Sequence, residues 1–232
     1  MCESSLVPRD SSAGSLRPTD RTALRRKKER GSHERELINA ILDEALVCHV
    51  GFTTQRGPVV LPMFYARIGD DLFVHGAAGN DMLRHLDSGT QVCVTVTLLD
   101  GLVFARSAFH HSMNYRSVVL FGVAERVTDP TVMRRVSDAL LDHLAPGRSG
   151  DARPPTDEEL RATRVVRLPI REGSAKVREG GPIDDADDMA LPVWAGELPV
   201  GLRAGHPVTD PQGHEQPGVP TYISAHLLLD TP

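Results

Sequence analysis

The sequence is poor in residues that often mark a disulfide scaffold or a cysteine-based site. Of its 232 residues, 3 are cysteine and 1 is tryptophan, and aromatic residues make up 4%. Cys2, Cys48 and Cys93 show no C-x-x-C spacing, and two of them lie in apolar runs, where a thiol packs as a small hydrophobe. We therefore expect reduced thiols and neither a disulfide framework nor a cysteine metal site.

Positive charge and long apolar runs are also missing. The formal net charge is −5, which argues against a surface that attracts nucleic acid or anionic lipid as a whole. No stretch approaches the ~20 apolar residues that span a bilayer, and the N-terminus lacks the apolar core of a secretion signal. We expect a cytoplasmic protein with no nucleic-acid partner and no membrane partner.

Several catalytic motifs are absent. The chain contains no G-x-S-x-G elbow, no H-E-x-x-H, no Walker loop and no G-x-G-x-x-G. The 10 histidines are scattered. His110 and His111 are adjacent on a predicted strand, where neighbouring side chains point to opposite faces, so they cannot share one metal ion. No metal site is predicted.

The composition is typical of a soluble globule, with 40% apolar and 25% charged residues. The length suits one domain with extensions at its ends. Residues 1–32 are rich in Ser, Arg and Pro, and predict a flexible basic N-terminal arm. Residues 33–200 form the predicted domain, and residues 201–232 a Pro/Gly-rich extension. The N-terminal segment contains a basic cluster, which either is solvated or packs on a partner subunit or near a phosphate. The cluster comprises Arg25, Arg26, Lys27, Lys28 and Arg30.

Helical spacing of apolar residues predicts two main helices. One begins after Ser32 and runs to Ala45, and the other begins at the Asp129-Pro130 cap and ends before Pro146. A capping box at residues 156–159 predicts a further short helix.

Six β-rich segments with short connections, and no alternation with helices, predict an antiparallel barrel rather than a doubly wound sheet. They span 46–53, 59–67, 71–75, 91–99, 102–110 and 114–127, and a later strand spans 163–170. Asp100-Gly101 favours a type I′ hairpin turn between two of them. Pro62 lacks a ladder donor, so its strand should lie at an edge or a bulge.

Residues 71–86 carry the most informative local pattern. A strand leads through a small-residue turn, Gly76 to Gly79, into an amphipathic helix. Free backbone N–H groups at such a helix start suit a phosphate, although the same pattern also describes a plain cap and tight turn. Arg67 and Arg84 are the cations that could pair with phosphate oxygens there.

Long blocks of the chain resemble one family. The strings ILDEALVCHVGF, LFVHGAAG, VCVTVTLLDGLVFARSAFHHSMNYRSVVLFG, RPPTDEEL, SAKVREGGP and LPVWAGELP occur in order between about Arg21 and about Val200. They resemble the flavin-nucleotide-binding branch of the pyridoxamine 5'-phosphate oxidase-like family, which also resembles nitroimidazole reductases. The resemblance implies a mainly β fold with flanking helices: a six-stranded antiparallel split β-barrel that dimerises and binds FMN between subunits.

The resemblance also implies a set of cofactor-binding residues. The FMN phosphate would lie near the turn after the third strand, His75 near the flavin edge, and Trp194 over the flavin from the partner chain; ordinary packing is the alternative for both side chains. Asp81 departs from the family pattern. Its carboxylate either points away from the phosphate site, as a partner of the helix dipole, or weakens phosphate binding. The implied cofactor-binding residues are Pro62, Met63, Arg67, His75, Gly76, Gly79, Asn80, Arg84, Tyr115, Arg116, Ser117 and Trp194.

The expected function is that of an FMN-dependent oxidoreductase acting on a small organic molecule, as a homodimer, with a nicotinamide nucleotide as one candidate electron donor. The alternative is a non-catalytic flavin- or haem-binding protein. In that case His75, His110 and His111 are the candidate axial ligands.

Overall fold

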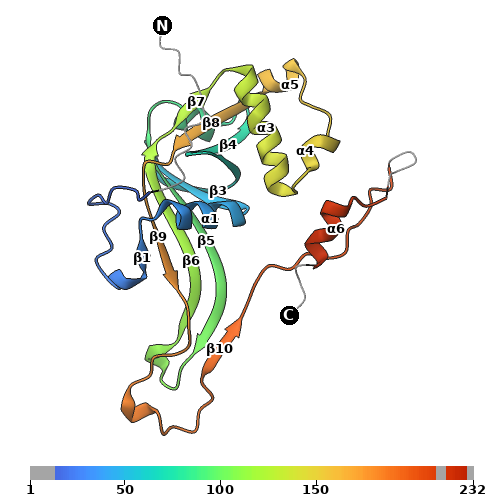
Figure 1. Cartoon of the computed structure of the whole chain (residues 1–232). Helices are drawn as coiled ribbons and strands as arrows, with labels where there is room; N and C mark the ends of the chain where they lie inside the picture. Colours follow the sequence, from blue (N-terminus) through green and yellow to red (C-terminus); the bar gives the residue numbers. More distant parts are fainter. Residues whose placement is uncertain (1–13, 213–217, 229–232) are drawn as a thin grey trace.

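The computed structural model describes residues 14–212 and 218–228, which form one antiparallel sheet flanked by helices (Figure 1). The strand order is β1-β9-β6-β5-β2-β3-β4-β8-β7, and β10 pairs with β5. The strands are β1 (Gly31–Ser32), β2 (Val47–Thr54), β3 (Gly57–Ile68), β4 (Asp71–Ala77), β5 (Gln91–Phe104), β6 (Ser112–Val123), β7 (Glu125–Val127), β8 (Thr163–Pro169), β9 (Glu172–Arg178) and β10 (Gly196–Pro199). The helices are α1 (Arg35–Glu44), α2 (Asp81–Leu86), α3 (Pro130–Leu144), α4 (Arg148–Asp151), α5 (Asp157–Ala162) and α6 (Thr221–Leu228), with the 3-10 turns η1 (Lys28–Arg30), η2 (Ala108–His110) and η3 (Ala186–Asp188).

The barrel interior is filled by alternating positions of its strands. In β5, Val92, Val94 and Val96 are buried, while the residues between them face outward, as a period of two requires. Ile38 and Leu42 of α1 are fully buried in the same core. A cavity of about 10 Å³ remains inside the barrel, enough for about one water molecule. This cavity is too small for a cofactor of flavin size.

A second, smaller core lies between α3 and the far face of β4 and β8. Met133, Val136 and Leu140 of α3 pack with Phe73 and Val165. As predicted, Asp129 caps this helix, accepting a hydrogen bond from the backbone N–H of Thr131 at 2.7 Å, with Pro130 in its first turn. The predicted capping box of α5, between Thr156 and Glu159, is also present.

The barrel is split where β3 changes partners. Residues 57–64 of β3 pair with β2, and Tyr65 to Ile68 pair with β4. Among the described residues, the end of β4 from His75 to Ala77 pairs with β8 alone. Pro62 therefore lies on a strand segment with one paired side, as its missing N–H predicted. Leu83 of α2 is buried in the core beside this split.

The predicted hairpin turn at Asp100-Gly101 is wrong. β5 continues through both residues, with a register shift against β6 between Leu99 and Gly101, and the chain reverses only at residues 105–111. Gly101 serves a close approach instead, because a Cβ there would lie 3.1 Å from Glu197 Oε1 and 3.4 Å from the Leu198 carbonyl oxygen of β10. β5 and β6 thus form one long hairpin, and its distal half projects beyond the barrel (Figure 1). We call this distal half, with residues 179–199, the arm.

The mainly β split-barrel architecture is confirmed, and the strand count is larger than the six predicted. Ala124 interrupts the predicted strand 114–127, so β7 forms separately and pairs with β8. β9 was missed because Gly173, Ser174 and Ala175 have little β propensity, although all three are buried against β6. The short strands β1 and β10 were missed as well.

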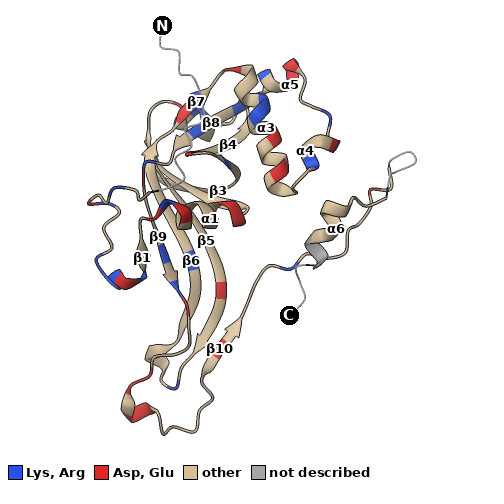
Figure 2. Ribbon diagram, in the orientation of Figure 1, with Lys and Arg blue, Asp and Glu red and all other residues tan. Residues whose placement is uncertain are grey.

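Part of the predicted N-terminal arm is packed. Leu16 is 3% exposed within the main core, and its N–H donates to the His33 carbonyl at 2.8 Å. Thr22 is also buried. The basic residues 25–28 are exposed, and blue segments mark them beside η1 in Figure 2. Cys2 lies outside the described residues. Among the described helices, none combines the length and apolarity needed to cross a membrane.

The tight contact between β9 and β6 gives a first testable prediction. A Cβ at Gly173 would lie 2.6 Å from Leu120 Cδ2 and 2.9 Å from the Val119 carbonyl oxygen, so Gly173→Ala should lower the free energy of unfolding by ~1–3 kcal/mol. Gly181→Ala is the control, because a Cβ there meets nothing within 4 Å. Urea denaturation of both variants measures the difference. Equal losses in the two would contradict the assigned packing.

Candidate functional site

The outer face of the sheet carries a row of mainly polar side chains. Ser117 of β6 lies opposite Thr97 of β5, and Thr95 of β5 lies opposite His49 of β2. His49 in turn lies opposite Pro62 of β3. Strand spacing of ~4.8 Å makes this row about 14 Å wide from β6 to β3. It offers hydrogen-bond donors and acceptors and no carboxylate, which suits a flat heteroaromatic ring. We call it the outer face.

Three residues of the outer face were not predicted. His49, Thr95 and Thr97 alternate with buried apolar residues in β2 and β5. The sequence VCVTVT carried the signal, because a strand that is apolar at every second position presents its remaining residues on one surface. Met63 lies beside Pro62 but turns toward the barrel, opposite the buried Cys48, and packs partly against the core.

The described cysteines supply no thiolate to the site. Burial raises the pKa of the Cys48 thiol to about 12. Burial also raises the pKa of Cys93, on the outer side of β5, and the nearby Arg21 offsets only part of that effect. Both thiols are therefore protonated at neutral pH, and nucleophilic cysteine chemistry is not favoured here.

His75 stands on the other side of the split from Pro62. It lies opposite Val165 of β8, and its Nδ1 is buried without a hydrogen-bond partner among the described residues. Burial lowers the pKa of this imidazole, so it is neutral at pH 7. An unpaired buried nitrogen is costly unless a ligand or a water satisfies it. Among the predicted site residues that the structure describes, His75 alone has a buried side-chain polar atom without a hydrogen-bond partner.

The turn after β4 has the predicted shape. A Cβ at Gly76 would lie 2.9 Å from Leu83 Cδ1, so glycine permits α2 to pack closely on β4. At Gly79 a Cβ would meet nothing within 4 Å, which leaves this backbone approachable. Asn80 caps α2 by accepting a hydrogen bond from the Leu83 N–H at 3.2 Å.

Charges at the start of α2 are already paired. Arg84 forms an exposed ion pair with Asp81, and the Arg84 hydrogen bond lowers the pKa of the Asp81 carboxyl. The charge of Arg56, in the β2–β3 turn, acts on Asp81 in the same direction. Asp81 therefore forms an ion pair with Arg84 and is not an isolated negative charge. Arg56 is a second cation near this turn, which the sequence did not predict.

Arg67 does not join this group. Its Nε donates to Asp43 Oδ1 at 2.7 Å, and its Nη1 donates to the Gly69 carbonyl at 2.5 Å. It lies opposite Leu72, five residues before Ala77, and therefore about 17 Å along β4 from the glycine turn. The length of β4 therefore separates the two candidate cations, Arg67 and Arg84, within one chain. Arg67 instead fastens α1 to the β3–β4 turn.

The three polar residues predicted on β6 separate in the same way. Ser117 and Tyr115 lie on the outer face, where Ser117 Oγ donates to the Lys176 carbonyl at 3.3 Å. Arg116 points to the opposite face and pairs with Glu44 of α1 and with Asp100, at 2.8 Å from the latter. These two carboxylates raise the pKa of Arg116 above its usual value. Arg116 is therefore a structural cation.

Trp194 lies in the arm, far from the outer face. Its ring centroid is 5.8 Å from that of Phe104, which is 6.0 Å from the ring of His111. Phe104 is nine residues from Thr95 on β5, a distance of about 30 Å. Within one chain, Trp194 and Pro62 therefore lie too far apart to contact the same flavin ring.

Apolar side chains of the arm face solvent. Phe109 is 87% exposed and Trp194 68% exposed, and Met113, Val193 and Leu198 are exposed as well. Clusters of this kind on a soluble protein mark contact surfaces for another chain or for a ligand.

Comparison with known proteins covers the barrel and the arm. A profile of the family described as pyridoxamine 5'-phosphate oxidase matches residues 34–177. The structure of the flavocytochrome Anf3 from Azotobacter vinelandii is similar at a TM-score of 0.85 and 38% identity, covering 90% of this chain and 98% of that one. The structure of the FAD and haem binding protein from Mycobacterium smegmatis is similar at a TM-score of 0.81 and 37% identity. The match covers 85% of this chain and 97% of that one.

A more distant similarity is to a candidate 5-nitroimidazole antibiotic resistance protein from Bacteroides thetaiotaomicron, with a TM-score of 0.50 and 26% identity over 60% of this chain and 81% of that one. No curated protein sequence matches the chain significantly. The family profile spans α1 to β9, and the two most extensive of these matches keep more than a third of the residues identical. The chain therefore belongs to the pyridoxamine 5'-phosphate oxidase family.

Proposed function

We propose that this protein is a flavin- and haem-binding oxidoreductase that works as a homodimer on a small organic substrate. The observation that carries the proposal is the extent of two similarities. A flavocytochrome matches 90% of the chain, and an FAD and haem binding protein matches 85%, so both reach beyond the 34–177 region of the family profile. Homologous proteins of this identity usually keep the residues that hold a shared cofactor.

The outer face and the split fit a flavin. The row from Ser117 to Pro62 is flat, free of carboxylates and rich in hydroxyl groups, and His75 offers a buried unpaired nitrogen across the split. The flavin, when bound, would supply the electron-transfer chemistry. This chain would orient the ring, donate or accept one hydrogen bond at His75 Nδ1, and hold the phosphate near Gly79. FMN is the flavin predicted from the sequence, and FAD carries the same ring and a phosphate at the same position.

His111 has the arrangement of an iron-ligating imidazole. Its Nδ1–H donates to the Ser107 carbonyl at 3.0 Å, which fixes the tautomer and leaves Nε2 free on an exposed side chain. Ligating histidines commonly use the second nitrogen in this way. The rings of Phe104 and Trp194 and the exposed Phe109 supply apolar surface for a porphyrin. His110 is less suited because its Nε2 contacts Asp185.

A homodimer would complete the site. The arm exposes apolar side chains, and the outer face lies about 30 Å from Trp194 in the same chain. In a twofold dimer the arm of one subunit can cover the outer face of the other, so each cofactor would contact both chains. An FMN oxidoreductase without haem is the second candidate function, because the outer face does not depend on His111. A reduced nicotinamide nucleotide is the electron donor to test.

The cofactor prediction concerns the purified wild-type protein and a His111→Ala variant. The wild type should release a flavin and haem b, identified by mass spectrometry, and show flavin bands with a Soret band. His111→Ala should retain flavin and lose most of the haem, while the control His206→Ala should keep both. Flavin alone, bleached by a reduced nicotinamide nucleotide, would support the second candidate. A colourless protein that takes up neither group would contradict both.

The phosphate prediction uses the Asp81–Arg84 pair. Asp81→Asn should free Arg84 and tighten FMN, whereas Arg84→Ala should weaken FMN about tenfold, since a charged hydrogen bond contributes about 1.5 kcal/mol or more. Riboflavin, which lacks the phosphate, should respond little. Arg153→Ala removes another exposed arginine from an ion pair, with Glu159, and should change neither affinity. Quenching of flavin fluorescence measures all four proteins. Equal weakening of FMN and riboflavin would place the phosphate elsewhere.

The dimer prediction concerns the arm. Light scattering should return a dimer for the wild type and a shift toward monomer for Leu198→Asp, because a buried unpaired carboxylate opposes association. Leu144→Asp on α3 is matched in exposure, 51% against 50%, and should leave the dimer intact. A monomeric wild type with flavin bound, or equal effects of the two variants, would contradict an interface at the arm.

A further inference from the structure

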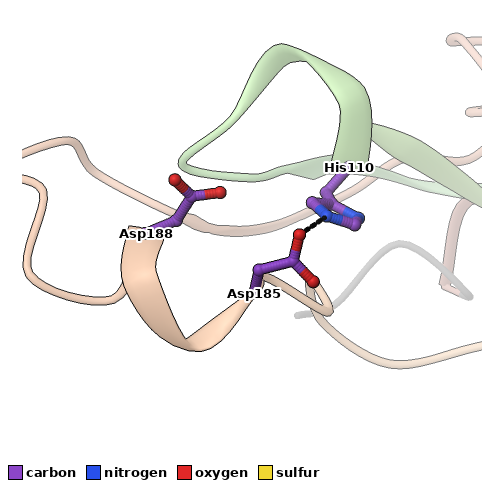
Figure 3. Close-up of side chains that lie close together, drawn as sticks. All are labelled: His110, Asp185 and Asp188. Atoms are coloured by element: carbon purple, nitrogen blue, oxygen red, sulfur yellow. Dashed lines mark hydrogen bonds and ion pairs between the residues drawn. The ribbon is translucent and has the colours of Figure 1, made fainter.

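Three side chains with metal-binding atoms meet at the tip of the arm. The ligand atoms of His110, Asp185 and Asp188 all lie within 4.8 Å of one another. His110 Nε2 donates to Asp185 Oδ2 at 3.2 Å, and Asp188 reaches toward the same space from the next turn (Figure 3). The histidine comes from η2, between β5 and β6, and both carboxylates come from the η3 region, more than 70 residues later.

Local geometry holds the two carboxylates on one side. Asp185 caps η3, and the Asp188 N–H donates to the Asp185 carbonyl at 3.0 Å. Residues three apart in a 3-10 turn are eclipsed, so their side chains project in the same direction. His110 ends a 3-10 turn of its own, in which its N–H donates to the Ser107 carbonyl at 3.2 Å. Two rigid turns thus face each other across the cluster.

A buried ion pair fixes the distance between these turns. Asp184 is almost fully buried, and it accepts hydrogen bonds from the Arg106 N–H and guanidinium, both at 2.9 Å. Burial acts to raise the pKa of Asp184, but these hydrogen bonds together lower it below its usual value. Asp184 therefore has a structural role: its ion pair with Arg106 positions the next residue, Asp185, beside His110.

The cluster lacks a cationic partner. The run from Asp184 to Asp188 holds four carboxylates, seen as the acidic tip in Figure 2, and Arg106 pairs with one of them. Within the described part of the chain, neither Lys nor Arg forms an ion pair with Asp185 or Asp188, and the Asp188 side chain has no hydrogen bond. A divalent cation would neutralise both charges and replace their mutual repulsion with attraction.

We propose that His110, Asp185 and Asp188 bind a divalent transition metal ion, Zn²⁺ by preference. One imidazole and two carboxylates match the ligands of zinc, at Zn–N and Zn–O distances of ~2.0–2.2 Å. The three ligand atoms lie within 4.8 Å of one another, and the side chain of Asp185 is exposed, so binding would require the carboxylates to move closer to the imidazole. Imidazole favours Zn²⁺ over Mg²⁺ and Ca²⁺, which prefer all-oxygen sites. Three protein ligands leave a position for water, so the ion is exchangeable.

The sequence analysis predicted no metal site, because it treated His110 and His111 as neighbours on a strand. In the structure His110 lies in a 3-10 turn, and the two carboxylates beside it come from a distant segment. The site also goes beyond the proposed flavin and haem function. Zinc would link the segment that carries Trp194 and β10 to the β5–β6 connection. The ion would thereby stabilise the conformation of the arm.

The test is a zinc titration of the tag-free, full-length chain after treatment with a chelator. Isothermal titration calorimetry with ZnCl₂ should show one site per chain, and zinc should raise the midpoint of thermal unfolding. His110→Gln and Asp188→Asn should each weaken this binding about tenfold or more and abolish the thermal shift. Ca²⁺ should bind more weakly than Zn²⁺.

Asp187→Asn is the matched control, since Asp187 belongs to the same acidic run but not to the cluster. It should keep zinc affinity within about twofold of wild type, because it removes one unit of charge and no ligand. Absence of saturable zinc binding by the wild type would overturn the proposal. So would equal losses in Asp187→Asn and Asp188→Asn, which would mean diffuse attraction to the acidic run. Neither outcome bears on flavin or haem, which are measured by absorbance on the same samples.

Discussion

The alternation of β5 is the constraint on which the rest of the structure depends. Its even positions from Val92 to Val96 are buried in the barrel, so Cys93, Thr95 and Thr97 must face outward. If β5 shifted by one residue against its neighbouring strands, three valines would become exposed and two hydroxyl groups buried. The pairing register of β5 is therefore strongly specified. The same strand then continues past the barrel to Phe104 and becomes half of the arm. One strand thus links the core, the outer face and the tip that carries the histidines.

Most arginines near the barrel are committed to structure. Arg67 binds Asp43, Arg116 joins Glu44 and Asp100, and Arg164 joins Asp87 to the Ala78 carbonyl. Each pair connects elements that are distant in sequence, which suits the planar, multiply donating guanidinium. These arginines are therefore not available to an anionic ligand. The Asp81–Arg84 pair is more exposed and lies within one helix, so it can rearrange around a phosphate more easily than these pairs can.

The sequence was sufficient where local patterns decide structure. The helices α1 and α3, the cap at Asp129 and the edge position of Pro62 all follow from spacing, capping chemistry or a missing donor. It was insufficient where distant segments decide. Asp100-Gly101 has the composition of a tight turn, yet β10 packs against Gly101 and β6 pairs across it, so tertiary pairing overrides turn propensity.

The predicted site residues show the same division. Gly76, Gly79, Asn80 and Arg84 are close in sequence and lie together at one turn. Arg67 and Arg116 were chosen for their charge, but the carboxylates that occupy them come from α1 and from β5. Local sequence shows which residues can bind an anion. It does not show which of them the fold has already paired.

Unpaired polar groups are informative for that reason. In the barrel nearly every guanidinium has a carboxylate or carbonyl partner, so the fold is able to satisfy charges where stability alone requires it. Among the described residues, groups without a partner include His75 Nδ1 at the split, His111 Nε2 at the arm and the carboxylate of Asp188, besides buried side-chain atoms of His33, Asn39, Arg106 and Arg178. Leaving such groups unpaired costs free energy unless something else binds them. His111 also lies beside the ring of Phe104, and Asp188 lies in a turn that faces the turn of His110. This coincidence of an unsatisfied group with a prepared surface favours bound ligands over imperfect packing.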